Sequence, residues 1–105
     1  MSFAENLKKL PDISHLAAVN LLDNDENTVA TIENKPGSQG SLAVYNHLAQ
    51  TYGSINIDAA KKGLEIFAEH TDDAREHAGK HPNIDRLIAI ENGQPALRVK
   101  HIFAV

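Results

Sequence analysis

The chain has 105 residues, of which 42% are hydrophobic and 23% are charged, as in ordinary globular proteins and unlike disordered or fibrous chains. The formal net charge of −4 argues against sequence-independent binding to nucleic acid, and the lack of cysteine excludes disulfides, thiolate metal sites and cysteine nucleophiles. No signal-like apolar region opens the chain, and no run reaches the roughly 20 apolar residues needed to span a membrane. These features predict one cytoplasmic domain, residues 1–105, with no membrane or nucleic-acid partner.

The N-terminal part of the chain predicts a short helix followed by a β-hairpin. Ser2 and Glu5 have the spacing of a capping box, which favours a helix start at this point. Residues 16–22 and 28–32 are apolar or β-branched runs typical of strands, and residues 23–27 between them are rich in Asp and Asn, which favour turns.

Two helices are predicted in the middle of the chain. A loop over residues 35–41 leads into a helix over 42–52, which Gly53 would end. A second helix is predicted to begin after Asn56, a suitable N-cap, and to continue into a histidine-rich segment. Gly63 weakens this helix by roughly 1 kcal/mol relative to alanine, so it indicates either close packing or a weak helix.

The end of the chain predicts a second hairpin. Asn92 and Gly93 lie between two strand-like runs and are the pair that favours a type I′ turn. Strand alternation in this register places His101 on the core face, opposite Ile84. The simpler interpretation of His101 is a buried neutral histidine with one nitrogen hydrogen bonded, and the alternative is a two-imidazole site with His81.

The predicted fold is therefore an α+β two-layer sandwich. Its order is α-β-β-α-α-β-β, with about four antiparallel strands from two hairpins and the two longer helices on one face. The last strand is apolar up to Val105, and an unprotected apolar edge invites strand pairing. We therefore expect a homodimer or a complex with a protein partner.

Residues 69–85 contain three of the six histidines and form the densest group of side chains that could bind metal or transfer protons. On one helix, four of them would share a stripe, and His and Asp side chains in such a group can bind zinc or another divalent metal. The set is His70, Asp73, His77 and His81. No His-Glu-x-x-His motif supports this metal site.

The same segment has simpler interpretations. Gly79 and Pro82 favour a helix that ends near Ala78, and residues 71–73, Thr-Asp-Asp, are typical of an N-cap that starts a fresh short helix. Only Asp73 and His77 then keep the helical i, i+4 spacing. The segment would in that case be a solvated helix end with local ion pairs. A contact surface that responds to pH is the third interpretation, because histidine titrates between about pH 5 and 8.

The loop before the first long helix is a candidate anion site, because free N–H groups at a helix N-terminus attract anions. The residues that would bind phosphate or carboxylate there are Gly37, Ser38, Gly40 and Ser41. The loop lacks the Gly-x-x-x-x-Gly-Lys-Ser/Thr pattern of nucleotide-binding P-loops, and Ser41 is also explained as a helix N-cap. A plain strand-to-helix turn is therefore the alternative.

Three phrases of the sequence, residues 32–41, 68–75 and 79–87, resemble a small bacterial family of uncharacterised proteins of about this length. The resemblance spans essentially the whole chain. It implies a bacterial, single-domain protein, and it brings no activity, cofactor or catalytic residue with it.

The expected function is that of a small interaction or regulatory protein without catalysis, recognised through its sheet edge and its acidic helical surface. One alternative is a metal-binding protein or a metal-dependent enzyme that uses the His/Asp set of residues 70–81. The other is a binder of small anions at residues 37–41. No cofactor is predicted beyond the zinc or other divalent metal of the first alternative.

Overall fold

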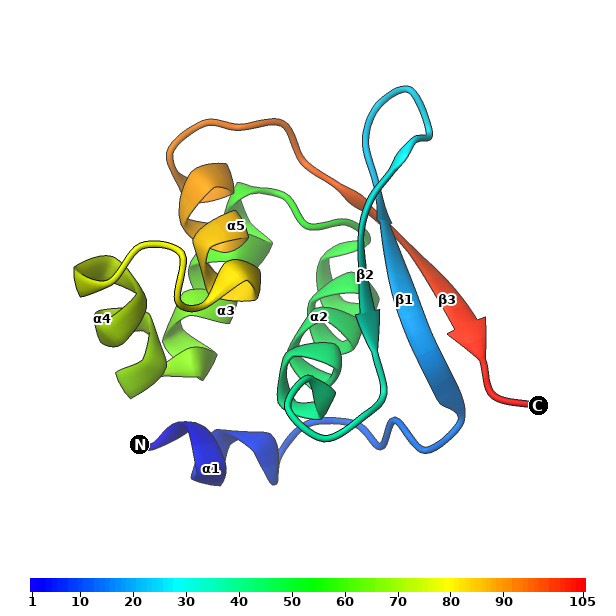
Figure 1. The fold of residues 1–105 in the computed structure, drawn as a ribbon, viewed down its shortest axis with the longest axis horizontal. Coiled ribbons are helices and arrows are strands. Elements are labelled where there is room, and N and C mark those ends of the chain that lie inside the picture. Colours follow the sequence, from blue (N-terminus) through cyan, green and yellow to red (C-terminus); the bar gives the residue numbers. More distant parts are fainter.

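A computed structural model describes residues 1–105 and contains five helices and three strands (Figure 1). In chain order these elements are α1 (Phe3–Leu7), β1 (Leu16–Leu22), β2 (Thr28–Glu33), α2 (Gln39–Tyr52), α3 (Ile57–Phe67), α4 (Glu69–Glu76), α5 (Pro82–Glu91) and β3 (Arg98–Phe103). The fold is α+β, as predicted, but it has three strands instead of about four, and its order is α-β-β-α-α-α-α-β.

The predicted N-terminal helix and first hairpin are confirmed. The Ser2 hydroxyl accepts the backbone N–H of Glu5, and the Glu5 carboxylate accepts that of Ser2, so α1 begins with a capping box. Strands β1 and β2 pair antiparallel. Between them, the Asp23 carboxylate accepts the N–H groups of Asp25 and Asn27 at 2.9 Å, which fixes the turn.

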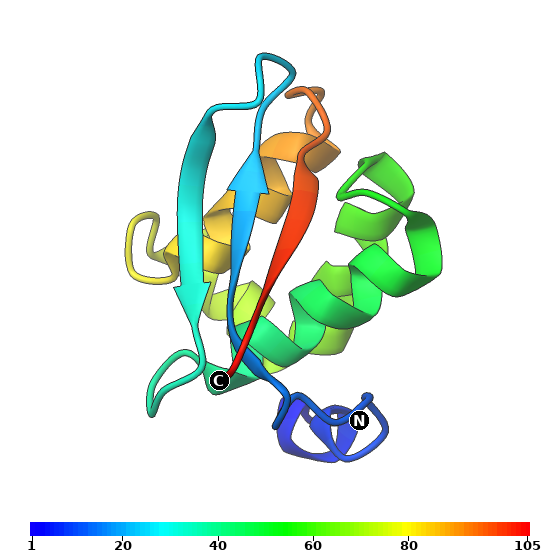
Figure 2. The same cartoon turned by 90° about the vertical axis from the view of Figure 1, so that its right-hand side faces the viewer.

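The sheet has the order β2-β1-β3, with all neighbours antiparallel, so β3 pairs with the first strand and not with residues 84–91. His101 lies opposite Val19. Figure 2 shows the three strands side by side, with no helix covering their outer face. Because β1 is the central strand, β2 and β3 are both edge strands.

The predicted C-terminal hairpin is wrong, because residues 82–91 form helix α5. Pro82 occupies the first turn, where its missing N–H is tolerated, and the buried side chains Ile84, Leu87 and Ile90 follow helical spacing. Gly93 has a φ of 110°, and the N–H of the next residue donates to the carbonyl of Ala89 at 3.0 Å. The Asn-Gly pair therefore ends a helix, a position that needs the same positive φ as a type I′ turn.

The middle helices differ from the prediction at two points. Helix α2 starts at Gln39, so Ser41 lies inside the helix and is not its N-cap, whereas Gly53 ends it with a φ of 82° as predicted. Asn56 caps α3 as predicted. The helix then breaks at Ala68, whose φ is 50°, so α4 is a separate short helix that starts at Glu69 and not near Thr71. Alanine carries no sequence signal for a break, since positive φ normally selects glycine.

Helix α2 lies directly against the sheet, and α3, α4 and α5 lie on its far side (Figure 1). The sheet is thus covered by one helix and not by the two longer helices together. A single cluster of 18 buried hydrophobic residues joins the layers. None of the helices combines the length and apolar character that a membrane crossing needs.

Helix α3 makes its closest contacts at Gly63. A Cβ atom at this position would lie 2.7 Å from Leu87 of α5 and 2.9 Å from Leu48 of α2. Both distances are shorter than van der Waals contact, so Gly63 allows α3 to pack against two helices at once. Of the two interpretations drawn from the sequence, close packing is the one that holds.

We expect Gly63→Ala to lower the free energy of unfolding by up to about 2 kcal/mol. Overpacking a core costs about 1–3 kcal/mol, and the better helix propensity of alanine offsets about 1 kcal/mol. Urea denaturation would measure the change. Lys62→Ala, at the exposed neighbouring position, should change stability by less than about 0.5 kcal/mol. A Gly63→Ala variant more stable than the native chain would contradict the close packing.

Candidate functional site

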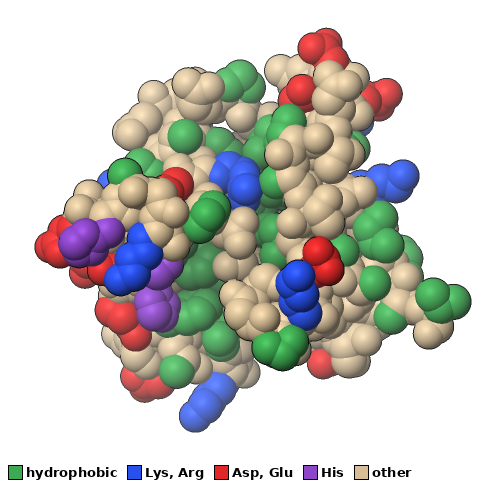
Figure 3. Space-filling view, viewed as in Figure 1, with side chains coloured by type: hydrophobic (Ala, Val, Ile, Leu, Met, Phe, Trp, Pro, Cys, Tyr) green, Lys and Arg blue, Asp and Glu red, His purple; other side chains and the backbone are tan.

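A pocket of about 260 Å³ opens where the loop before α2 meets the connection between α4 and α5. Its lining residues are Phe3, Gly37, Ser41, Phe67, His70, Lys80, His81, Pro82, Asn83 and Ile84. On this side of the molecule, histidine and lysine side chains gather next to hydrophobic ones (Figure 3). The pocket thus joins residues from the predicted anion loop to residues from the predicted metal segment.

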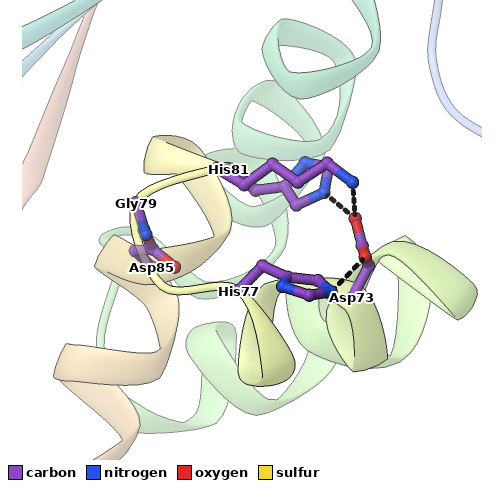
Figure 4. A network of polar contacts seen from close by, with 6 residues as sticks. Asp73, His77, Gly79, His81 and Asp85 are labelled. Carbon is purple, nitrogen blue, oxygen red and sulfur yellow. Dashed lines mark hydrogen bonds and ion pairs between the residues drawn. The ribbon is translucent and has the colours of Figure 1, made fainter.

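Asp73 organises the charged side of the pocket (Figure 4). Its Oδ2 atom lies 2.6 Å from Nε2 of His81 and 2.9 Å from Nζ of Lys80. The hydrogen bond with His81, followed by that with Lys80, lowers the pKa of Asp73 from its ordinary value of 3.8 to about 2. The carboxylate is therefore ionised at neutral pH, and it holds the Lys80 ammonium and the His81 imidazole at the pocket.

The local sequence explains why Lys80 and His81 turn back toward α4. Gly79 adopts a φ of 93°, which reverses the chain soon after α4 ends. Its N–H donates to the carboxylate of Asp85 at 2.8 Å, as Figure 4 shows. Pro82 then starts α5 at once, so the connection is short and fixed at both ends.

The first turns of two helices supply further donors. Ser41 lies in the first turn of α2 and Asn83 in that of α5, and the backbone N–H of neither residue donates a hydrogen bond within the protein. Such N–H groups, with the positive end of the helix dipole, favour an anion. Asn83 is fixed in place, since its carbonyl accepts the Tyr45 hydroxyl and its side chain accepts from Arg86 at 2.9 Å.

Aromatic rings form the other side of the pocket. The ring of Phe3 stacks on Phe67 with centroids 5.1 Å apart and meets His70 edge-on at 5.2 Å. His70 in turn lies 5.8 Å from His81, measured between ring centroids. Gly40 makes room for Phe3, because a Cβ atom there would lie 3.0 Å from the phenyl ring.

The predicted anion residues divide into two pairs. Gly37 and Ser41 line the pocket. Gly40 lies beneath Phe3, and the Ser38 hydroxyl donates to the backbone carbonyl of Glu33, so neither faces the pocket.

The predicted metal ligands converge only in part. His70 and His81 line the pocket and Asp73 lies beside them, but His77 lies 3.8 Å from Asp73 with 59% of its side chain exposed. No three or more His, Asp or Glu side chains lie together in a geometry that could hold a metal ion. Metal binding by these residues stays a prediction.

Phe3, Lys80 and Asn83 line the pocket but are not among the site residues predicted from the sequence. None of them belongs to a motif, and only the packing of α1, α4 and α5 brings them to the pocket. His101 does face the core, and its Nε2 atom lies 2.9 Å from the side-chain oxygen of buried Asn46. The proposed pairing of His101 with His81 does not form, because His81 binds Asp73.

A family model described as "Uncharacterized protein conserved in bacteria (DUF2322)" matches residues 3–101. The chain belongs to this family. Membership confirms the resemblance carried by residues 32–41, 68–75 and 79–87, and the match includes every residue that lines the pocket. No curated protein and no solved structure matches the chain.

The Asp73 contacts predict a specific dependence of stability on pH. Because the pKa of Asp73 is about 2 in the folded chain and 3.8 ordinarily, the unfolded chain takes up the proton first as the pH falls. The stabilisation by Asp73 is therefore complete above about pH 4 and lost as the pH falls toward about 2. Urea denaturation across this range should show a shallower loss of stability for Asp73→Asn than for the native chain. Asp72→Asn makes the same change at the exposed neighbouring residue, and it should keep the native dependence of stability on pH. Equal slopes for all three proteins would contradict the contact.

Proposed function

We propose that this protein is a small cytoplasmic regulatory protein that binds a phosphate or carboxylate group in the pocket. The observation that supports the proposal is the convergence of Lys80 and two histidines with two uncommitted helix N–H groups on one concavity. Each of these groups can donate to an anion.

The contacts of Asp73 favour an anion over a metal ion in the pocket. A cation would need the carboxylate of Asp73, but the Lys80 ammonium lies 2.9 Å from it and already neutralises it. An anion gains from the same arrangement, because Lys80 and His81 are held near the pocket before any ligand arrives. Such preorganisation reduces the entropic cost of binding.

Titration with inorganic phosphate, followed by amide NMR shifts, tests this proposal. We expect saturating shifts at Ser41, His81 and Asn83 in the millimolar range. Lys80→Gln should weaken binding about fivefold, because a partly exposed charge contributes up to about 1 kcal/mol. Lys62→Gln removes the same charge from an exposed position on α3 and should leave the affinity unchanged. Silence of these amides across millimolar phosphate would remove the proposal.

A second candidate function is self-association through β3. This strand lies at the edge of the sheet. Apart from its pairing with β1, the only β-bridge near it joins Ile55 to Leu97, the residue just before the strand begins. Phe103 on the strand is 65% exposed. We propose that β3 pairs with β3 of a second copy to form a homodimer, because an uncovered edge strand presents unpaired backbone groups.

Light scattering over a range of concentrations tests the homodimer. Phe103→Lys should shift the protein toward monomer, since a lysine on an edge strand discourages pairing. Val29→Lys makes the same change on the opposite edge strand, where Val29 is 51% exposed, and should leave the mass unchanged. A native chain that is monomeric at every concentration would reject this candidate.

A further inference from the structure

We propose that the ligand of the pocket is an aryl phosphate monoester, with its phosphate at Lys80 and His81 and its ring against Phe3. This inference rests on the proposed anion binding and specifies the chemical class of the ligand.

The pocket has an apolar lining in addition to the hydrogen-bond donors that an anion needs. Ser41, Lys80, His81 and Asn83 supply hydrogen-bond donors, while Phe3, Phe67 and Ile84 supply apolar lining. An inorganic anion would use only the first group. A ligand that uses both must carry an apolar body next to its charge.

The aromatic side is held in place by contacts outside the pocket. No residue of α1 is buried, so this helix has little core of its own. Besides the packing of Phe3 on Phe67, two hydrogen bonds hold it. The Phe3 N–H donates to the Glu69 carboxylate at 2.8 Å, and the Asn6 amide donates to the carbonyl of Ile66 at 2.9 Å. Phe3 itself is half-buried, so its ring is positioned yet still accessible from the pocket. A fixed aromatic ring favours a planar partner that can stack on it or meet it edge-on.

The volume limits the size of the ligand. At about 260 Å³ the pocket falls below the roughly 300–1,000 Å³ typical of sites for drug-sized ligands. One ring and one phosphate suit this space, and a dinucleotide does not.

The number of donors favours phosphate over carboxylate as the charged group. Ser41 and Asn83, each with a free backbone N–H, line one pocket together with Lys80 and His81. These donors come from three segments: α2, α5 and the connection between α4 and α5. A phosphate has three terminal oxygens and nearly two negative charges, so it can accept from several directions at once. A carboxylate has two oxygens in one plane.

Comparison of three ligands on the full chain tests the inference: phenyl phosphate, inorganic phosphate and benzoate. Calorimetry or amide shifts should give phenyl phosphate an affinity about tenfold higher than that of inorganic phosphate, since an aromatic contact adds to simple burial. Benzoate should bind more weakly than phenyl phosphate. Equal affinities of phenyl phosphate and inorganic phosphate would overturn the aryl part, and benzoate binding as tightly as phenyl phosphate would overturn the phosphate part. In both cases anion binding itself would stand, whereas no binding of any of the three would reject the site.

Substitution of Phe3 locates the ring. In Phe3→Ala, the affinity for phenyl phosphate divided by the affinity for inorganic phosphate should fall from about ten to near one. Phe3→Leu keeps apolar packing for α1 and should also lose most of the ratio, which separates loss of the ring from loss of the helix. Ile57→Ala truncates an apolar side chain that is 46% exposed at the start of α3 and should keep the native ratio. An unchanged ratio in both Phe3 variants would overturn the placement.

Discussion

The close contact at Gly63 positions the rest of the helical layer. Because position 63 has no side chain, Leu48 of α2 and Leu87 of α5 both reach the α3 backbone. The same two helices are joined again where the buried Tyr45 hydroxyl donates to the carbonyl of Asn83. Burial raises the pKa of Tyr45 to about 12, so this hydroxyl keeps its proton at neutral pH. The first turns of α2 and α5 therefore meet at one pocket because of packing deeper in the protein.

Asp73 has an equivalent role for the charged side chains. Helix α4 carries it, and the hydrogen bonds from Lys80 and His81 tie the following connection back to that helix. A bound anion would compete with Asp73 for the same two donors. The carboxylate thus orders the empty pocket but also reduces its positive potential, which is consistent with weak, reversible binding. Reversible binding suits a regulatory protein better than permanent retention of a cofactor.

The sequence predicted those features that depend on local chemistry. The capping box at Ser2, the Asp23 turn and the end of α2 at Gly53 each follow from one or two side chains acting on nearby backbone. The prediction failed where one local pattern fits two structures. Ile84, Ile88 and Ile90 are compatible with strand alternation and with a helical stripe, and Gly93 supplies a positive φ to either a hairpin turn or a helix end. Only burial against α3 decides between them.

The candidate site shows the same limit at the level of tertiary structure. The segments around Ser41 and His81 were identified separately, because each contains residue types that bind ligands. Their meeting depends on the helix break at Ala68, which separates α4 from α3 and gives His70 and Asp73 a new direction. The N-cap pattern at residues 71–73 indicates a new helix in this segment, but nothing in the sequence marks Ala68 as the point of the break. Lys80 was missed for a related reason: an isolated lysine gains significance only when the chain folds it against Asp73.

Helix α2 connects the pocket to the edge strand β3. Its first turn contributes Ser41 to the pocket. Further along the helix, Oδ1 of the buried Asn46 accepts a hydrogen bond at 2.9 Å from Nε2 of His101 in β3. The other polar atom of Asn46, Nδ2, has no hydrogen-bond partner, although a buried unpaired donor costs about 1–3 kcal/mol. The contact with His101 is thus the only hydrogen bond made by the side chain of Asn46, which is buried between helix and sheet. A shift of α2 that broke it would leave the whole amide unpaired, so movements that keep the helix seated on β3 cost less free energy than movements that separate the two.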